Sequence, residues 1–266
     1  MFEEPYRWIE VIRNRRDYLE EQLSAGSPIV ALPYQNGALL ATLGSGTSKL
    51  YEIYDQIAFG AIGHPADIEK LRSVVLDSAH IEGFNRSPMD VNVQRLIKFG
   101  LAPMVKQAFE EVLHAPYICK IVMVEMSLPS GAPRFFQLNY DGVFEERESG
   151  LALAPTSLSA ERMEAFLKTI GETTALSLKE VLQIALRTWA VSQLPPPSEG
   201  QDPTPDTQEP VPTDTPTIKQ LDPLLKKCLE ERTVEAVVLD RTQPGSSKYR
   251  ALSKEEIQMM MKGALK

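Results

Sequence analysis

The loop at residues 44–49, Gly-Ser-Gly-Thr-Ser-Lys, contains the residue types of this chain that can do chemistry. Three kinds of chemistry fit it. Its glycines can let main-chain N–H groups surround a phosphate. Its Gly46–Thr47 bond can be cut by the chain itself, which would free a threonine whose own amino group acts as the base. Alternatively, the loop is a structural turn that directs the Lys49 ammonium toward a partner.

The phosphate alternative fails on spacing. A phosphate-binding P-loop needs the pattern Gly-x-x-x-x-Gly-Lys-Ser/Thr between a strand and a helix. Here Gly44, Gly46 and Lys49 are too close together, and the alternating pattern of residues 49–55 predicts a strand after the loop. The sequence therefore does not favour a nucleotide site.

Metal and disulfide chemistry is not indicated either. His64, His80 and His114 have no ligand-like spacing, and Cys119 and Cys228 are far apart in the chain. Two cysteines are too few for a disulfide framework, and they lack zinc-finger spacing. We expect reduced thiols, no metal and no cofactor.

The net charge and the hydropathy pattern exclude further classes. The chain of 266 residues carries 28 basic and 36 acidic residues, a formal charge of −8, which argues against a general nucleic-acid binder. No apolar stretch approaches the roughly 20 residues of a membrane span, and the N-terminus has no apolar signal core. We expect a soluble, cytoplasmic protein.

The N-terminal segment predicts a helix with a thin apolar stripe. Pro5 suits the first helical position and Gly26 would end the helix. Apolar residues recur at helical spacing, namely Ile9, Ile12, Leu19 and Leu23, and charged residues occupy the other faces. Such a helix is expected to lie across the outside of another surface.

The next forty residues predict two antiparallel strand pairs. Residues 27–34 and 37–44 flank Gln35-Asn36-Gly37, and an Asn-Gly pair between two apolar runs is a good hairpin signal. Residues 49–55 and 56–63 form the second pair, with a tight turn at Asp55-Gln56. Short turns between consecutive strands indicate antiparallel sheet from the start.

Helices and strands then alternate in pairs. Pro65 begins one helix, Asp90 is expected to cap the next, and Pro103 is expected to kink it. Strands follow at residues 117–126 and 134–142. Two further helices are a segment at about 159–170 that stops at Gly171, and one that opens with Ser177 and Glu180 in capping-box spacing.

Residues 194–217 differ in composition from the rest of the chain, because they contain eight prolines, five acidic residues and no basic residue. This composition predicts a disordered, extended insert. Folded structure is expected to return with a helix near 218–230, strands at 233–241 and 247–253, and a helical tail from Lys254.

This order of elements predicts an α+β fold, a four-layer α-β-β-α sandwich that forms one domain. The expected divisions are an N-terminal segment and helix (1–26), the main part of the sandwich (27–193), the insert (194–217), the remainder of the sandwich (218–253) and a C-terminal tail (254–266).

Taken together, the segments at 29–72, 91–111, 134–146 and 234–241 resemble a bacterial proteasome α subunit in their order and spacing. The resemblance covers about residues 5–192 and 233–253, and it implies the N-terminal-nucleophile hydrolase fold. The helix before the first strand is typical of α rather than β subunits. Two departures are the Phe-Glu-Glu-Pro-Tyr-Arg-Trp start, which lacks the Tyr-Asp-Arg signature of archaeal and eukaryotic α subunits, and the segment 221–231, which has no counterpart.

The resemblance implies a non-catalytic subunit. Seven copies would form the outer ring of a core particle, stacked on β subunits that hold the threonine nucleophiles, and the ring would gate the entry of protein substrates and dock a hexameric AAA ATPase activator. Lys49 and Gly63 would line the activator-docking pocket between neighbouring subunits. The gate would be Met1, Phe2, Glu3, Glu4 and Pro5, and Ile9, Ile12, Leu19 and Leu23 would face the neighbour's helix in the ring.

The resemblance also bears on the self-cutting alternative. A cut at Gly46–Thr47 would remove a helix and two strands, and the positions where the family places its active-site Asp and Lys fall on Gly63 and Ala79. Two other functions stay open on the residues alone. One is a self-processing peptidase or amidase of the same fold, and the other is an interaction scaffold that acts through the proline-rich insert.

Overall fold

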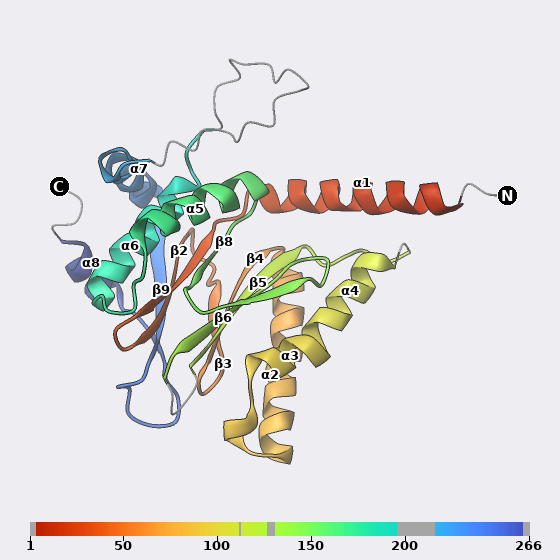
Figure 1. The fold of residues 1–266 in the computed structure, drawn as a ribbon, viewed down its shortest axis with the longest axis horizontal. Helices are drawn as coiled ribbons and strands as arrows, with labels where there is room; N and C mark the ends of the chain where they lie inside the picture. Colours follow the sequence, from red (N-terminus) through yellow and green to blue (C-terminus); the bar gives the residue numbers. More distant parts are fainter. Residues whose placement is uncertain (1–3, 112, 127–130, 196–215, 263–266) are drawn as a thin grey trace.

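The computed structural model describes residues 4–111, 113–126, 131–195 and 216–262, and it contains two stacked antiparallel sheets (Figure 1). One sheet has the strand order β10-β9-β2-β1-β8, with β1 Ile29–Tyr34, β2 Gly37–Gly44, β8 Leu151–Leu153, β9 Thr233–Asp240 and β10 Tyr249–Ala251. The other has the order β3-β4-β5-β6-β7, with β3 Leu50–Tyr54, β4 Ile57–Gly63, β5 Cys119–Met126, β6 Pro133–Leu138 and β7 Phe144–Arg147.

Helices cover the outer face of each sheet (Figure 1). The first sheet carries α5 Ser157–Ile170, α6 Leu178–Val191, α7 Ile218–Glu231 and α8 Lys254–Met261. The second sheet carries α2 Pro65–Asn85, the 3-10 turn Pro88–Asp90, α3 Val93–Leu96, the π-helical turn Ile97–Leu101 and α4 Ala102–Glu110. The predicted four-layer α-β-β-α sandwich is therefore confirmed.

Three apolar cores hold these layers together. One lies between the first sheet and its helices and contains the fully buried Trp189. A second lies between the other sheet and α2–α4, around Phe59 and Phe136. The third fills the space between the two sheets and includes Phe135. Both faces of each sheet are thus covered, which explains why β1 and β2 are buried at every position instead of at alternate ones.

Both predicted hairpins form, and the first turn differs from the expected one. Tyr34 pairs with Gly37, so the two loop residues are Gln35 and Asn36, and the glycine is the first residue of β2. A Cβ atom on Gly37 would lie 1.9 Å from the carbonyl oxygen of Leu239. The glycine therefore serves the close approach of β9 and not the turn itself. The second turn lies at Asp55-Gln56 as predicted, since Tyr54 pairs with Ile57.

One prediction for the segment before α4 is wrong. Asp90 does not cap the helix, because it lies in the 3-10 turn, and Asn92 is the cap, accepting the Arg95 N–H at 3.0 Å. The predicted kink at Pro103 falls next to an interruption of the regular helix, since the π-helical turn Ile97–Leu101 ends two residues before the proline. A proline lacks an N–H and crowds the preceding turn, and the wider turn accommodates both effects.

Helix α1 Glu4–Ser24 extends away from the sandwich (Figure 1). Its predicted apolar stripe divides into two parts. Leu19 and Leu23 are fully buried in the core between the sheets, while Ile12 is half-buried and Ile9 is 57% exposed. The C-terminal turns of α1 are thus part of the chain's own core, and its N-terminal half presents an apolar surface.

Two further comparisons with the sequence concern the predicted insert and the absence of a predicted membrane span. The insert predicted at 194–217 lies, apart from its first two and last two residues, outside the described residues. The parts of the chain on either side of it share one sheet, because β9 pairs with β2 along its whole length. Among the described residues, no helix has the length and apolar character needed to cross a membrane.

Candidate functional site

The glycine loop joins β2 to β3, and one carboxylate from β9 holds its end. Glu235 accepts hydrogen bonds from the main-chain N–H groups of Lys49 (3.0 Å to Oε2) and Leu50 (3.1 Å to Oε1), and from the Ser48 hydroxyl. The donors that a phosphate would need at this point are therefore bound to the chain's own anion. This arrangement makes the loop a fixed structural turn.

The geometry gives the self-cutting alternative no chemical partner. Thr47 is exposed in the loop. Of the two positions counted from it, Gly63 has no side chain and Ala79 is buried in the core between α2 and the second sheet. A cut before Thr47 would also remove β1 and β2, which lie in the middle of the first sheet.

Lys49 is half-buried directly before β3, and charges of both signs act on its ammonium. Burial lowers the pKa of its ammonium, the Glu235 carboxylate opposes this shift, and the Arg232 guanidinium adds to it. A partly desolvated ammonium is stabilised when a further carboxylate approaches it. Lys49 can therefore gain from an external anion, as the sequence prediction requires.

Gly63 ends β4, at the same end of the second sheet as Lys49. The Ala61 N–H donates to the Lys49 carbonyl at 3.3 Å, so Gly63 lies two residues beyond the residue opposite the lysine. At Gly63 φ is +138°, and a Cβ atom would lie 2.0 Å from the Ile118 carbonyl oxygen. The two predicted pocket residues thus lie at the same end of the second sheet, and the glycine has a packing reason for being there.

A groove of about 340 Å³ opens beside the glycine loop, and Lys49 does not line it. Ser48 and Leu50 line this groove together with Glu235 and Tyr249. Successive side chains of a strand point to opposite faces, so Lys49 lies on the other face of β3. A pocket that includes Lys49 must therefore be formed with residues other than those that line this groove.

The predicted ring-contact residues and two of the five predicted gate residues fall on α1. Met1, Phe2 and Glu3 lie outside the described residues, and Glu4 and Pro5 form the first helical positions. The exposed half of the helix has a shallow hollow lined by Trp8, Ile9, Ile12, Arg13, Arg16, Asp17 and Glu20. Sequence reasoning omitted Trp8, which is 46% exposed, although a tryptophan beside an apolar stripe is itself a signal for a contact surface.

Sequence reasoning missed Glu235, the residue that holds the end of the glycine loop. It lies within a strand that was recognised only by its apolar run, and its partners are 185 to 187 positions earlier in the chain. One signal was available: a carboxylate between apolar neighbours in a strand needs a donor when it is partly buried. Within the described part of the chain, no three His, Cys, Asp or Glu side chains gather as a metal site.

Comparisons with known proteins point to one family. No protein-family model matches the chain. Curated proteins named "Proteasome subunit alpha" are similar to it, including those of Actinosynnema mirum (27% identical, 64% of this chain and 60% of that protein), Frankia casuarinae (27%, 69% and 75%) and Acidothermus cellulolyticus (28%, 75% and 83%). The match to the Actinosynnema protein thus spans less than two thirds of that protein. These similarities confirm the resemblance inferred from the sequence.

Proposed function

We propose, from its similarity to proteasome α subunits, that this chain is a non-catalytic α subunit of a proteasome core particle that degrades proteins in the cytoplasm. One observation carries the proposal beyond the similarity. Helix α1 is fixed to the core through Leu19 and Leu23, yet it presents Trp8 and Ile9 to the outside. A surface of this kind on a rigid helix suits a contact with another copy of the chain.

A structural argument supports the absence of catalysis. An N-terminal nucleophile needs a free amino group at the start of a strand. Here α1 leads into β1 through Gly26, and the buried Ser27 next to it donates its hydroxyl to the Leu43 carbonyl and accepts the Trp189 Nε1–H at 2.9 Å. This hydroxyl is engaged as a structural group.

The proposed assembly is a ring of seven copies, stacked on a ring of β subunits. Neighbouring α1 helices would contact each other through the hollow of Trp8, Ile9 and Ile12, and the residues before the helix, 1–5, would form the gate at the pore.

Native mass spectrometry and electron microscopy test the assembly, on the chain alone and co-expressed with its candidate β subunit. We expect sevenfold rings that contain an uncut chain, and a four-ring barrel when the β subunit is present. A monomer under both conditions, or a chain that begins at Thr47, would contradict the proposal and favour a self-processing hydrolase.

The finer proposal is that Lys49 and Gly63 form one wall of a pocket that a neighbouring copy completes. The pocket would accept the C-terminal carboxylate of a hexameric AAA ATPase. An ammonium suits this partner because it can pair with a terminal carboxylate without demanding bidentate geometry.

Lys49→Ala is the variant that tests the pocket. Losing one charged hydrogen bond of about 1.5–3 kcal/mol per tail should weaken ATPase binding at least tenfold and abolish ATPase-stimulated degradation. Ring assembly and the hydrolysis of short peptides should not change. Lys226→Ala is the matched control, because Lys226 is an exposed lysine on α7. Unchanged ATPase binding by Lys49→Ala would remove the lysine from the proposal.

A further inference from the structure

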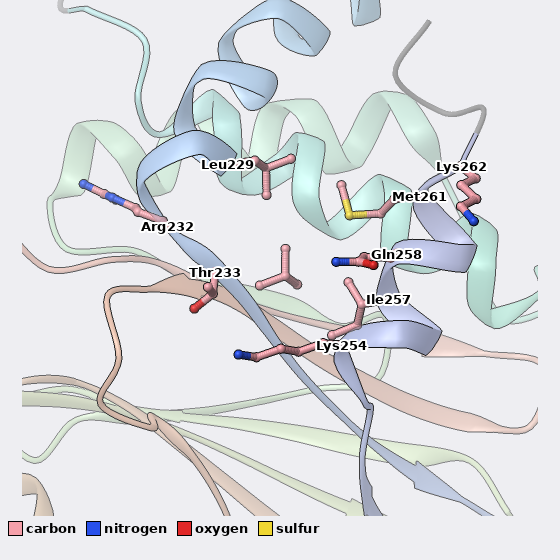
Figure 2. A pocket seen from close by; sticks show the side chains of 9 residues that line it. Leu229, Arg232, Thr233, Lys254, Ile257, Gln258, Met261 and Lys262 are labelled. Carbon is pink, nitrogen blue, oxygen red and sulfur yellow. The ribbon is translucent and has the colours of Figure 1, made fainter.

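A second groove lies on the opposite side of β9 from β2, where α7 ends and α8 begins (Figure 2). It has a volume of about 510 Å³ and is formed by the last turn of α7, the first residues of β9 and the length of α8. We call it the α7–α8 groove. The segment that forms much of α7 is the one without a counterpart in the family resemblance, so this groove is separate from the proposed activator pocket.

The interior of the α7–α8 groove is apolar. Leu229, Val234, Ile257 and Met261 line it, and Figure 2 shows Leu229 and Ile257 directed toward the hollow from opposite sides. Three of these residues are only half-buried, and Ile257 is nearly fully buried. An open apolar hollow of this kind stabilises a ligand that covers it with its own apolar side chains.

The rim of the groove is positively charged. Lys254 and Lys262 stand on two sides of the hollow in Figure 2, while the Arg232 side chain is directed away from it, with its guanidinium 5.4 Å from the centroid of the Trp189 ring. None of the nine residues that line the hollow is acidic. The two lysines are exposed, and among the described residues neither forms an ion pair. On a chain with a net charge of −8, this local excess of cations selects for an anionic partner.

The groove also exposes the edge of a strand. Pairing between β9 and β10 stops at Val237 and Ala251, with one further bond from the Leu252 N–H to the Ala236 carbonyl at 2.9 Å. Val234 lies beyond this point, and its partner in the sheet, Leu43, is on the other side of β9. Successive residues of a strand direct their main-chain N–H and C=O groups to opposite sides. Val234 is two residues from Ala236, so its N–H and C=O point to the same side as those of Ala236, toward the groove.

We propose that the α7–α8 groove binds an extended acidic segment of a partner protein. The segment would lie beside residues 233–235 as a short added strand. Alternate apolar side chains would contact the apolar interior, and the carboxylates between them would pair with Lys254 and Lys262. The strand edge favours a peptide over a fatty acid, because only a peptide backbone offers both a donor and an acceptor to Val234.

Fluorescence anisotropy with a labelled, capped hexapeptide of alternating glutamate and valine tests this proposal on the full chain. We expect saturable binding that weakens with added salt, and at least tenfold weaker binding of a hexapeptide of alternating lysine and valine. No saturable binding of the acidic peptide up to about 1 mM, or equal binding of the two peptides, would overturn the proposal. So would binding of dodecanoate without binding of the acidic peptide.

Two variants locate the binding. Lys254→Glu with Lys262→Glu should weaken acidic-peptide binding about tenfold, because two attractive charges become repulsive. The matched control is Lys226→Glu with Lys227→Glu, two exposed α7 lysines outside the lining, which should leave the affinity within about twofold. Val234→Pro removes the outward N–H, as prolines at strand edges do, and should also weaken binding. Unchanged affinity in the Lys254/Lys262 variant would place the peptide elsewhere and overturn the proposal.

Discussion

At the scale of single residues, the Glu235 carboxylate and the loop it holds show why function here could be read only in part from the sequence. Glycines, a threonine and a lysine in one short loop are compatible with three different chemistries. From the sequence alone, these can be ranked only by how well the spacing of the residues fits each known motif. The choice between them depends on a carboxylate whose hydrogen bonds span 185 to 187 positions of the chain. Periodicity and local motifs carry no information about such a contact.

Replacing Glu235 by glutamine tests this role. The amide keeps one acceptor oxygen and loses the charge, so we expect the free energy of unfolding to fall by about 1–2 kcal/mol. Urea unfolding followed by circular dichroism measures it, with Glu255→Gln on the exposed surface of α8 as the control. Equal stability of the two variants would mean that the Glu235 carboxylate does not stabilise the loop.

Two tyrosines, the buried Tyr140 and the half-buried Tyr249, predict how stability depends on pH. Burial, with the carboxylates of Glu235 and Glu52, raises the pKa of Tyr249 to about 12. Burial, with Glu20, raises the pKa of Tyr140 to about 12. The pKa of tyrosine in the unfolded chain is about 10. Because the folded state holds these protons more tightly, their contribution is complete below pH 10 and is lost as the pH rises toward 12.

Thermal unfolding at pH 8, 10 and 11 measures this effect against Tyr249→Phe. The variant loses the hydroxyl that donates to the Leu50 carbonyl at 3.3 Å, so it should be slightly less stable at pH 8. Its Tm should then fall less steeply than that of the wild type above pH 10, because one titrating group is gone. Parallel curves for the two proteins would show that Tyr249 does not titrate as described.

At the scale of elements, helix ends were predictable wherever one residue determines them locally. Ser177 and Glu180 form the predicted capping box, and Gly171, at φ +79°, ends α5 where the sequence indicated. The cap before α3 was not predictable, because Asp90 and Asn92 are both good capping residues two positions apart. Strand β8 was also missed, since three buried residues, Leu-Ala-Leu, show no alternation.

Helix α1 makes a prediction that separates folding from assembly. Leu19→Ala opens a cavity between the sheets and should lower the free energy of unfolding by about 2–5 kcal/mol. Ile9→Ala, on the exposed half of the same helix, should leave the stability of the isolated chain within about 0.5 kcal/mol and weaken ring formation.

Chemical unfolding and native mass spectrometry of the two variants check this pair. If Ile9→Ala formed rings as well as the wild type, the exposed half of α1 would not be a ring contact.

At the scale of the whole molecule, the layer order could be predicted because pairs of strands and pairs of helices alternate along the chain. The sheet partners could not. No sequence pattern indicates that β9, which follows the insert, pairs with β2 in the middle of the first sheet. We propose that residues 27–193 and 218–253 form one domain with the insert between them.

Replacing residues 196–215 by a short glycine-serine linker tests this organisation. Loop-closure entropy changes by only about 0.6 kcal/mol for each doubling of loop length, so the Tm should change little. Assembly and ATPase-stimulated degradation should also be unchanged. Loss of degradation in an intact particle would assign the insert a role in binding partners, and a large loss of stability would contradict the single-domain proposal.

The attachment of α1 has a mechanical consequence. A helix of 21 residues is about 30 Å long. Its last turns lie in the core between the sheets, and Arg15 near its middle donates to the Ala108 carbonyl at 3.2 Å, so the part before Arg15 projects from a fixed base. A small tilt at the base becomes a large displacement at the free end. In the proposed contact between two copies, binding would therefore depend on the angle between the two helices as well as on the surfaces that meet. Such a helix can align rigid bodies to a common angle with a contact that is itself weak.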